Sequence, residues 1–253
     1  MNTDHITTID HVLTALDEII QQSRQDNDTL GYFAALYRNV THEVKNGIAE
    51  NAFEDGARME KLDVLFAKRY LDAFYAHKAG KQTTHAWQKA FDNSTHYRPI
   101  VLQHLLLGMN AHISLDLGIA AAKTSKNHSL EDLHTDFNKI NDILSSLVNQ
   151  VEQDLIRIWP TWHKIIKFAN NSDKLIVNFS MQLARDGAWK FANRIFNKPD
   201  ANLEILIEER DQKVANISKI ITSPGFIANI ILCFIRIGER GSIAQKIKEL
   251  EHG

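Results

Sequence analysis

One stretch constrains the fold of this 253-residue chain more than any other. Residues 99–123 are apolar around almost the whole circumference of a helix, which is the pattern of a helix buried in a core. Four residues inside it follow one another at intervals of four, so they lie along one side of that helix. We call them the polar seam: His104, Gly108, His112 and Asp116. A carboxylate buried there must be paired, protonated or bound to a metal, because burying it alone costs too much free energy.

The rest of the chain predicts an all-α fold. Alternating apolar and polar runs typical of strands are absent, and the 4 prolines and 11 glycines fall mostly where helical patterns stop. We expect a single multi-helix bundle of about ten helices, residues 1–253, around a buried central helix at about 99–123. The weakest point is FNKPDA at 196–201, so a separate C-terminal packing unit from about residue 200 is the alternative.

Capping residues and prolines predict where helices begin and end. Pro160, in the corner WPTW, predicts the end of the long helix that precedes it. In the helix after that corner, Asp186 falls on the apolar stripe of Phe179 and Leu183, as judged by the 100° step of a helix. The predicted caps and first residues are Asp55, Thr83 or Thr84, Pro99, Ser129, Ser172 or Asp173, and Asp200.

Composition excludes several classes of protein. The formal net charge is −2 and no basic run carries interleaved aromatics, so we expect no nucleic-acid partner. The single cysteine, Cys233, excludes an internal disulfide and a cysteine-based zinc cluster, and its apolar neighbours predict a buried side chain. The N-terminus has no signal-peptide pattern, and residues 226–237 are too short to span a bilayer. We therefore expect a cytoplasmic protein with no transmembrane segment.

His112 and Asp116 are the candidates for chemistry. The spacing H-x-x-x-D places an imidazole and a carboxylate one turn apart, which suits two ligands of one metal ion or a histidine oriented as a general base. Asp63 and Asp186 are acids on largely apolar helical faces, so they are candidate further ligands. A nitrogen and oxygen ligand set of this kind predicts one divalent metal ion, either zinc or manganese.

A structural role is the alternative for all four residues. In that interpretation His112 and Asp116 are a buried hydrogen-bonded pair that fixes the position of the central helix. Asp63 and Asp186 would then form salt bridges with arginines at the edge of the core, and the candidates are Arg58, Arg69 and Arg185.

Three further residues are predicted to lie around the site rather than in it: His104, Asn110 and Arg185. His104 precedes His112 by eight residues, which is more than two helical turns, and this is too far for the two imidazoles to share one ion.

Part of the chain resembles a known family. The segments YRNVT (37–41), GMNAHISLDL (108–117) and ARDGAW (184–189) resemble a family of uncharacterised bacterial proteins that is named only as a domain of unknown function. The resemblance covers about residues 30–195. It names relatives without implying a reaction.

A more distant likeness is to the zinc-dependent phospholipase C and single-strand nuclease superfamily. Those all-helical enzymes carry a Leu-Gly pair, a His and an Asp four residues later on a core helix, as LLLGMNAHISLDLGIA does here. The likeness implies that His112 and Asp116 are zinc ligands. The superfamily's further His after the Asp and its later His-x-x-x-Glu pair are missing from this chain, so the likeness implies one metal ion at most.

Two functions follow from these observations. The first is a metal-dependent hydrolase, acting on a phosphoester, in which His112 and Asp116 hold the ion and a metal-bound water is the nucleophile. The second is a non-catalytic helical protein that binds a small molecule or a partner, in which the polar seam is structural. The sequence fixes neither the substrate nor the oligomeric state.

Overall fold

The computed structural model describes residues 3–126, 128–160 and 181–251. Eleven α-helices and no strands occur in these three ranges, which confirms the all-α prediction. The α-helices are α1 (Ile9–Asp26), α2 (Gly31–Ala49), α3 (Gly56–Lys78), α4 (His85–Asp92), α5 (Val101–Ala111), α6 (Leu117–Thr124), α7 (His134–Ile158), α10 (Met181–Ile195), α11 (Asp200–Thr222), α12 (Phe226–Gly238) and α13 (Ile243–Glu251). Short turns add η1 (Asn93–Thr95), η2 (His112–Asp116) and η3 (Glu131–Leu133).

Local chemistry sets several helix starts. The side chains of Asp55 and Thr84 each accept a backbone N–H from the first turn of α3 and α4, as the sequence predicts for both residues. Ser129 does not cap α7 directly, because the η3 turn stands between them. The helix start predicted at Ser172 or Asp173 lies outside the described residues.

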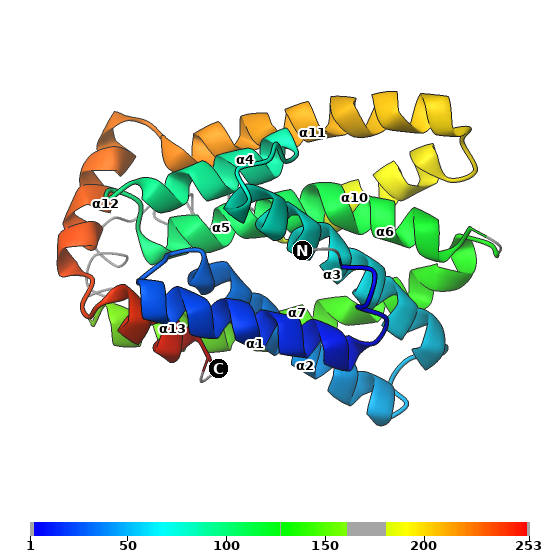
Figure 1. Cartoon of the computed structure of the whole chain (residues 1–253), viewed down its shortest axis with the longest axis horizontal. Coiled ribbons are helices and arrows are strands. Elements are labelled where there is room, and N and C mark those ends of the chain that lie inside the picture. Colours follow the sequence, from blue (N-terminus) through cyan, green and yellow to red (C-terminus); the bar gives the residue numbers. More distant parts are fainter. Residues whose placement is uncertain (1–2, 127, 161–180, 252–253) are drawn as a thin grey trace.

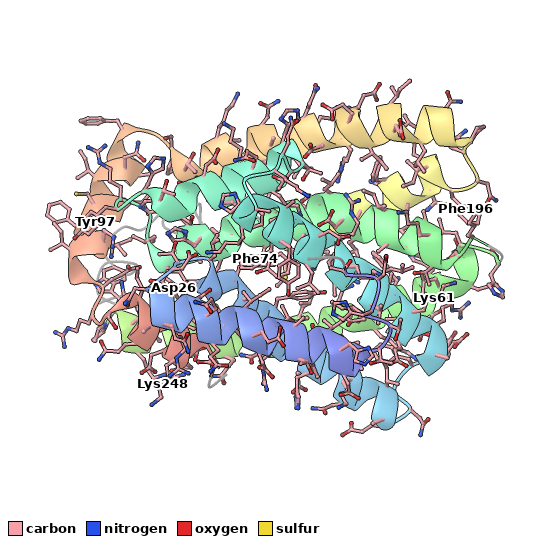
Figure 2. The ribbon with its side chains drawn as sticks, viewed as in Figure 1. Asp26, Lys61, Phe74, Tyr97, Phe196 and Lys248 are labelled. Carbon is pink, nitrogen blue, oxygen red and sulfur yellow. The ribbon has the colours of Figure 1, made fainter. Side chains whose placement is uncertain are left out.

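The central helix is buried as predicted. α5, η2 and α6 follow one another without a break and form one helix along the middle of the bundle, packed against α2, α3, α4, α10 and α11 (Figure 1). By length and composition alone, Val101–Thr124 is able to cross a membrane, and 89% of its most apolar window is buried inside the fold. Figure 2 shows Phe74 in the middle of the molecule and Lys61, Tyr97 and Lys248 at its periphery.

The middle of this helix departs from α geometry. The five residues of η2 form a π-helical turn, and the Leu117 N–H donates to the carbonyl of His112, five residues earlier. Ser114 lies inside this turn, and its carbonyl accepts a hydrogen bond of 2.8 Å from Arg210 Nε on α11. The sequence predicted an ordinary α-helix here, so His112 and Asp116 lie on a wider turn than expected. Turns of this kind are frequent at functional sites.

Two glycines let other elements approach this helix closely. A Cβ at Gly108 would lie 2.4 Å from a ring carbon of Phe33, and one at Gly118 would lie 2.7 Å from the backbone carbonyl of Ala188. Both distances are shorter than any normal contact. The glycines therefore bring α2 and α10 against the part of the central helix that carries His112 and Asp116.

The C-terminal helices share this core. α11 packs on α4 and α5, α13 packs on α1 and α2, and Val214 and Ile247 belong to the same apolar cluster as residues of the first helices. α12 is buried only on one side, with Leu232 inside and Phe234 exposed. Cys233, on the same helix, is also exposed, so the prediction of a buried cysteine is wrong.

Candidate functional site

Asp116 ends the π-helical turn and is completely buried. Three side chains from three elements converge on its carboxylate. Arg69 Nε on α3 lies 2.9 Å from Oδ1, and Trp87 Nε1 on α4 lies 2.7 Å from Oδ2. His112 Nδ1 lies 3.4 Å from Oδ2. The buried charge is therefore paired with a guanidinium and hydrogen-bonded by two rings, as a buried carboxylate requires.

These partners decide the charge of Asp116. Burial by itself would raise the pKa of this carboxyl, but Arg69 outweighs it with help from His112 and Trp87, and the pKa lies below its usual value. Asp116 is consequently ionised at neutral pH. The Arg69 side chain is 26% exposed, so the ion pair reaches from the interior to the surface.

An ionised Asp116 fixes the state of the His112 ring. A carboxylate only accepts hydrogen bonds, so the proton of the imidazole lies on Nδ1 and Nε2 keeps its lone pair. Burial lowers the pKa of His112, and Asp116 only partly offsets this, so the ring is neutral at pH 7. His112 Nε2 is thus a buried acceptor held in a fixed orientation.

Aromatic rings enclose His112. The Phe66 ring stacks on it with the centroids 3.5 Å apart and the planes 6° apart, and the Tyr37 ring stands edge-on at 4.5 Å. Three more rings lie within 6.1 Å of its centroid: Phe33, Tyr70 and Trp87. Apart from Asp116 at Nδ1, aromatic rings surround the imidazole, and this burial lowers its pKa.

Four buried polar atoms near this ring have no hydrogen-bond partner among the described residues. We call them the unpaired cluster: His112 Nε2, Tyr37 Oη, Thr41 Oγ1 and Asp63 Oδ2. Tyr37 connects these residues. Its ring contacts His112, Thr41 stands four residues further along α2, and the charge of Asp63 raises the pKa of the Tyr37 hydroxyl. Buried polar groups are nearly always bonded in native proteins, so four that are not in one place need an explanation.

The ionisation of the cluster follows from its burial. Burial raises the pKa of Asp63 to about 7, with a smaller contribution from Glu60. Burial likewise raises the pKa of Tyr37 well above its usual value, and the charge of Asp63 adds to the rise. The Thr41 hydroxyl offsets part of it, although the two hydroxyls do not meet in a hydrogen bond of normal geometry. At pH 7 the Asp63 carboxyl is therefore about half protonated, and below that pH it is mostly protonated, whereas Tyr37 and His112 are neutral.

Asp186 lies elsewhere. It is exposed on α10, and so is Leu183, so the prediction that Asp186 falls on the buried stripe of this helix is wrong. The side chains that α10 buries are Arg185, Ala188, Phe191, Ala192 and Ile195. The predicted stripe rests on Phe179, which lies outside the described residues, and on Leu183, which faces out.

The residues predicted to surround the site face other helices. Asn110 Nδ2 donates to the Val214 carbonyl at 2.9 Å and so ties the central helix to α11. Arg185 donates to the Phe137 carbonyl and its guanidinium lies over the Phe137 ring, and burial lowers its pKa to about 10. His104 packs edge-on against Tyr32, and burial lowers its pKa to about 3.

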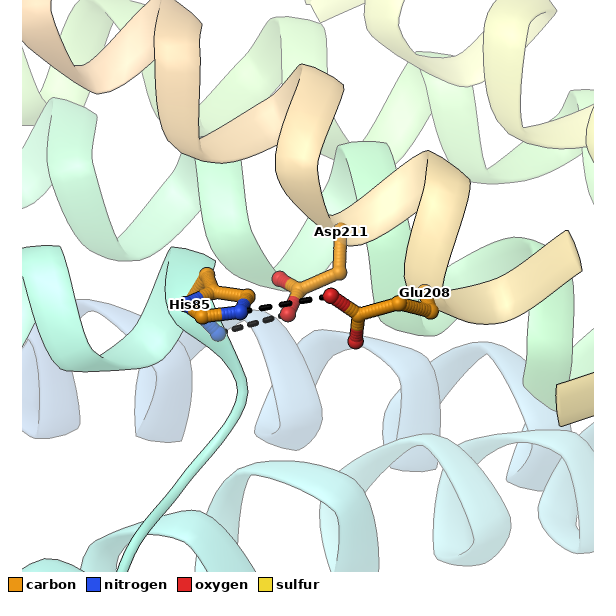
Figure 3. A group of neighbouring side chains, drawn as sticks. All are labelled: His85, Glu208 and Asp211. Carbon is orange, nitrogen blue, oxygen red and sulfur yellow. Dashed lines mark hydrogen bonds and ion pairs between the residues drawn. The ribbon is translucent and has the colours of Figure 1, made fainter. Parts of the chain in front are cut away.

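A second group of chemically reactive side chains lies at the surface. We call it the surface triad: His85, Glu208 and Asp211, whose ligand atoms all lie within 4.8 Å of one another (Figure 3). Among the described residues, His112, Asp116, Asp63 and Asp186 do not form a group of this kind. The structure thus brings His112 and Asp116 together and leaves Asp186 apart.

Sequence reasoning missed several residues of the interior site. Arg69 was a candidate partner for Asp63 or Asp186, and it pairs with Asp116 instead. The sequence does not mark Trp87 as a site residue, and its ring N–H donates to Asp116. Tyr37 and Thr41 open and close the segment YRNVT, and their spacing of four was the available signal that they share a face with each other.

Comparisons with known proteins give one match. A family model described as a family of unknown function (DUF5995) matches residues 9–224. No curated protein and no solved structure matches the chain. The predicted resemblance to an uncharacterised family is thereby confirmed, whereas the likeness to the phospholipase C and nuclease superfamily stays a prediction.

Proposed function

Because the chain belongs to a protein family of unknown function, DUF5995, we propose a function from its geometry alone. The protein binds a small, uncharged, polar molecule in the interior of its helical bundle, beside His112. Asp116 and Arg69 hold the His112 ring so that Nε2 accepts a hydrogen bond from that molecule.

The unpaired cluster is the observation that supports this proposal. An unsatisfied buried donor or acceptor costs about 1–3 kcal/mol, and four such atoms occur around Tyr37 and His112. Proteins commonly give up stability at binding and catalytic sites, so unpaired polar atoms in the core favour a binding role for them. A ligand that bonds to them recovers the cost on binding.

The chemistry of the cluster indicates the class of ligand. His112 Nε2 accepts, the hydroxyls of Tyr37 and Thr41 donate or accept, and a protonated Asp63 donates. The charges of Asp116 and Arg69 cancel each other, and the walls are aromatic. A neutral molecule with several hydroxyl or amide groups fits such an environment, whereas an ion would lose its hydration without a counter-charge.

A metal-dependent hydrolase at His112 and Asp116 stays a prediction that this geometry does not favour. Both oxygens of Asp116 already accept short hydrogen bonds, from Arg69 and from Trp87. A metal ion on the same carboxylate would lie beside the Arg69 guanidinium and be repelled by it. A ligand that bonds to His112 Nε2 leaves the hydrogen bonds of Asp116 to Arg69 and Trp87 in place.

Two buried threonines provide the first test. Thr41 Oγ1 has no described partner, whereas Thr124 Oγ1 donates to the Ala120 carbonyl at 2.8 Å. We expect Thr41→Val to leave the ligand-free stability unchanged or to raise it, and Thr124→Val to lower it by about 1 kcal/mol. Urea unfolding of the two variants and the wild type measures both. If Thr41→Val costs as much as Thr124→Val, the hydroxyl is satisfied in the ligand-free protein and the proposal fails.

Ligand binding itself is the second test. Thermal unfolding with a panel of uncharged polyols, sugars, amides and nucleobases should reveal a compound that raises the melting temperature, because it binds only the folded protein. Tyr37→Phe should abolish that rise while keeping or increasing the melting temperature without ligand. A rise that persists unchanged in Tyr37→Phe would place the compound at another site.

A further inference from the structure

The surface triad is built by two helices far apart in the sequence. His85 is the first residue of α4, and Glu208 and Asp211 are three residues apart on α11, so they face the same direction. In Figure 3 both carboxylates point at the start of α4. An imidazole beside two carboxylates is a ligand set that zinc and other divalent transition metals take.

The distance between His85 and Glu208 suits two ligands of one ion. His85 Nε2 lies 3.3 Å from Glu208 Oε1. Two ligands of a tetrahedral zinc ion, each about 2.0–2.1 Å from the metal, are separated by about 3.3 Å. The carboxylate of Asp211 is the third ligand of a set within 4.8 Å, and two ligands of one zinc ion are at most about 4.2 Å apart, so an ion would draw the three side chains closer together. Protein zinc sites with three ligands leave a fourth position for water, and His85 and Glu208 are each 53% exposed, so water has access.

Neighbouring groups hold the two carboxylates in place. Asp211 is buried, and its oxygens accept the backbone N–H groups of His85 and Ala86 at 2.6 and 2.8 Å. Gln212 Nε2 donates to Glu208 Oε1 at 2.7 Å. Hydrogen bonds to ligating carboxylates orient them in metal sites and are part of such sites. Each oxygen keeps a second lone pair for an ion.

We propose that His85, Glu208 and Asp211 bind one divalent transition-metal ion, zinc in the first place, and that the ion ties α4 to α11. The two carboxylates and a neutral imidazole give the site a net negative charge. The positive end of the α4 dipole offsets part of this charge, so the affinity is moderate rather than extreme. The site shares no residue with the interior site proposed above.

The test is equilibrium dialysis of the tag-free protein against zinc chloride, with bound metal measured by atomic emission. We expect one zinc ion per wild-type chain. His85→Ala and Glu208→Gln should each weaken binding at least about tenfold, and both side chains are exposed enough that folding is retained. Zinc should also raise the melting temperature of the wild type and not that of His85→Ala.

A second histidine beside a glutamate, the half-buried His134, is the matched control. His134 Nδ1 also lies 3.3 Å from a glutamate oxygen, that of Glu131, but it belongs to no group of three ligands among the described residues. His134→Ala should bind zinc as the wild type does. Equal zinc affinity in the wild type and in His85→Ala, or no binding by the wild type, overturns the proposal. Thr41→Val should leave zinc binding unchanged, which separates this site from the interior one.

Discussion

At the scale of single residues, the Asp116 carboxylate connects three helices. It accepts hydrogen bonds from Arg69 on α3, from Trp87 on α4 and from His112 on the central helix. The pairing with Arg69 explains how the charge of Asp116 is tolerated in the core. It also decides which nitrogen of His112 is left for a ligand.

Asp116→Ala should lower the free energy of unfolding by about 3–5 kcal/mol, because it leaves the Arg69 guanidinium and the Trp87 N–H without their acceptor. Urea unfolding at pH 7 measures the loss. Asp186→Ala is the control, and we expect a change within about 0.5 kcal/mol because this side chain is exposed. A loss at Asp116 no larger than that of the control would mean that the ion pair does not form.

Asp63 should make stability fall as pH rises. Its pKa is about 7 in the folded protein, against 3.8 when unfolded, so between these values the folded state holds a proton that the unfolded state has lost. Asp63→Asn removes the effect, and its stability relative to wild type should rise by at most about 1.4 kcal/mol per pH unit between about pH 4 and 7. His104 acts in the opposite direction in this range but is present in both proteins.

Urea unfolding at three pH values within that range measures the difference between Asp63→Asn and the wild type. A difference that stays constant with pH would show that Asp63 is ionised in the folded protein, and it would remove the donor assigned to it in the unpaired cluster.

At the scale of elements, the starts of helices were predictable and the turn that carries the site was not. Asp55 and Thr84 cap α3 and α4 through bonds within four residues, so the local sequence contains the signal. In η2 the Ser114 carbonyl accepts a hydrogen bond from Arg210, which is 96 residues away. The spacing of His112 and Asp116 predicted their contact, whereas no local feature of the sequence marks the widened turn.

Gly118→Ala should test the close approach of α10 to the central helix. The added methyl meets the Ala188 carbonyl, which is backbone and cannot swing aside, so we expect a loss of about 1–3 kcal/mol. Gly187→Ala, on α10, is the control because its methyl would meet only the end of the Arg210 side chain, at 3.1 Å. That variant should be neutral or gain up to about 1 kcal/mol from helix propensity. Thermal unfolding compares the two.

At the scale of the whole molecule, the apolar composition of residues 99–123 predicts that they lie out of water, and the structure shows that other helices enclose them. The composition does not say which helices enclose it. His85 and Asp211 are separated by 126 residues, and no periodicity within either helix indicates that they meet. The sequence also does not say which of the neighbours Arg185 and Asp186 faces the core, because a rotation of the helix by one residue exchanges them.

Hydrogen exchange should follow this arrangement. We expect the amides of α5 and α6 to exchange most slowly, since they are enclosed by five helices, and those of α12 to exchange much faster, since one of its faces is exposed. Mass spectrometry of peptic fragments after timed exchange in deuterated water measures both. Equal protection of α12 and α5 would indicate that α12 is covered in solution.

The short helix α4 connects the surface triad with the interior site. It begins at His85, whose backbone N–H is fastened to Asp211, and two residues later Trp87 reaches the carboxylate that orients His112. A cation held outside and a molecule held inside would thus both act on the position of one eight-residue rod. If each favours the same position of that rod, thermodynamic linkage requires that each tighten the binding of the other by the same factor.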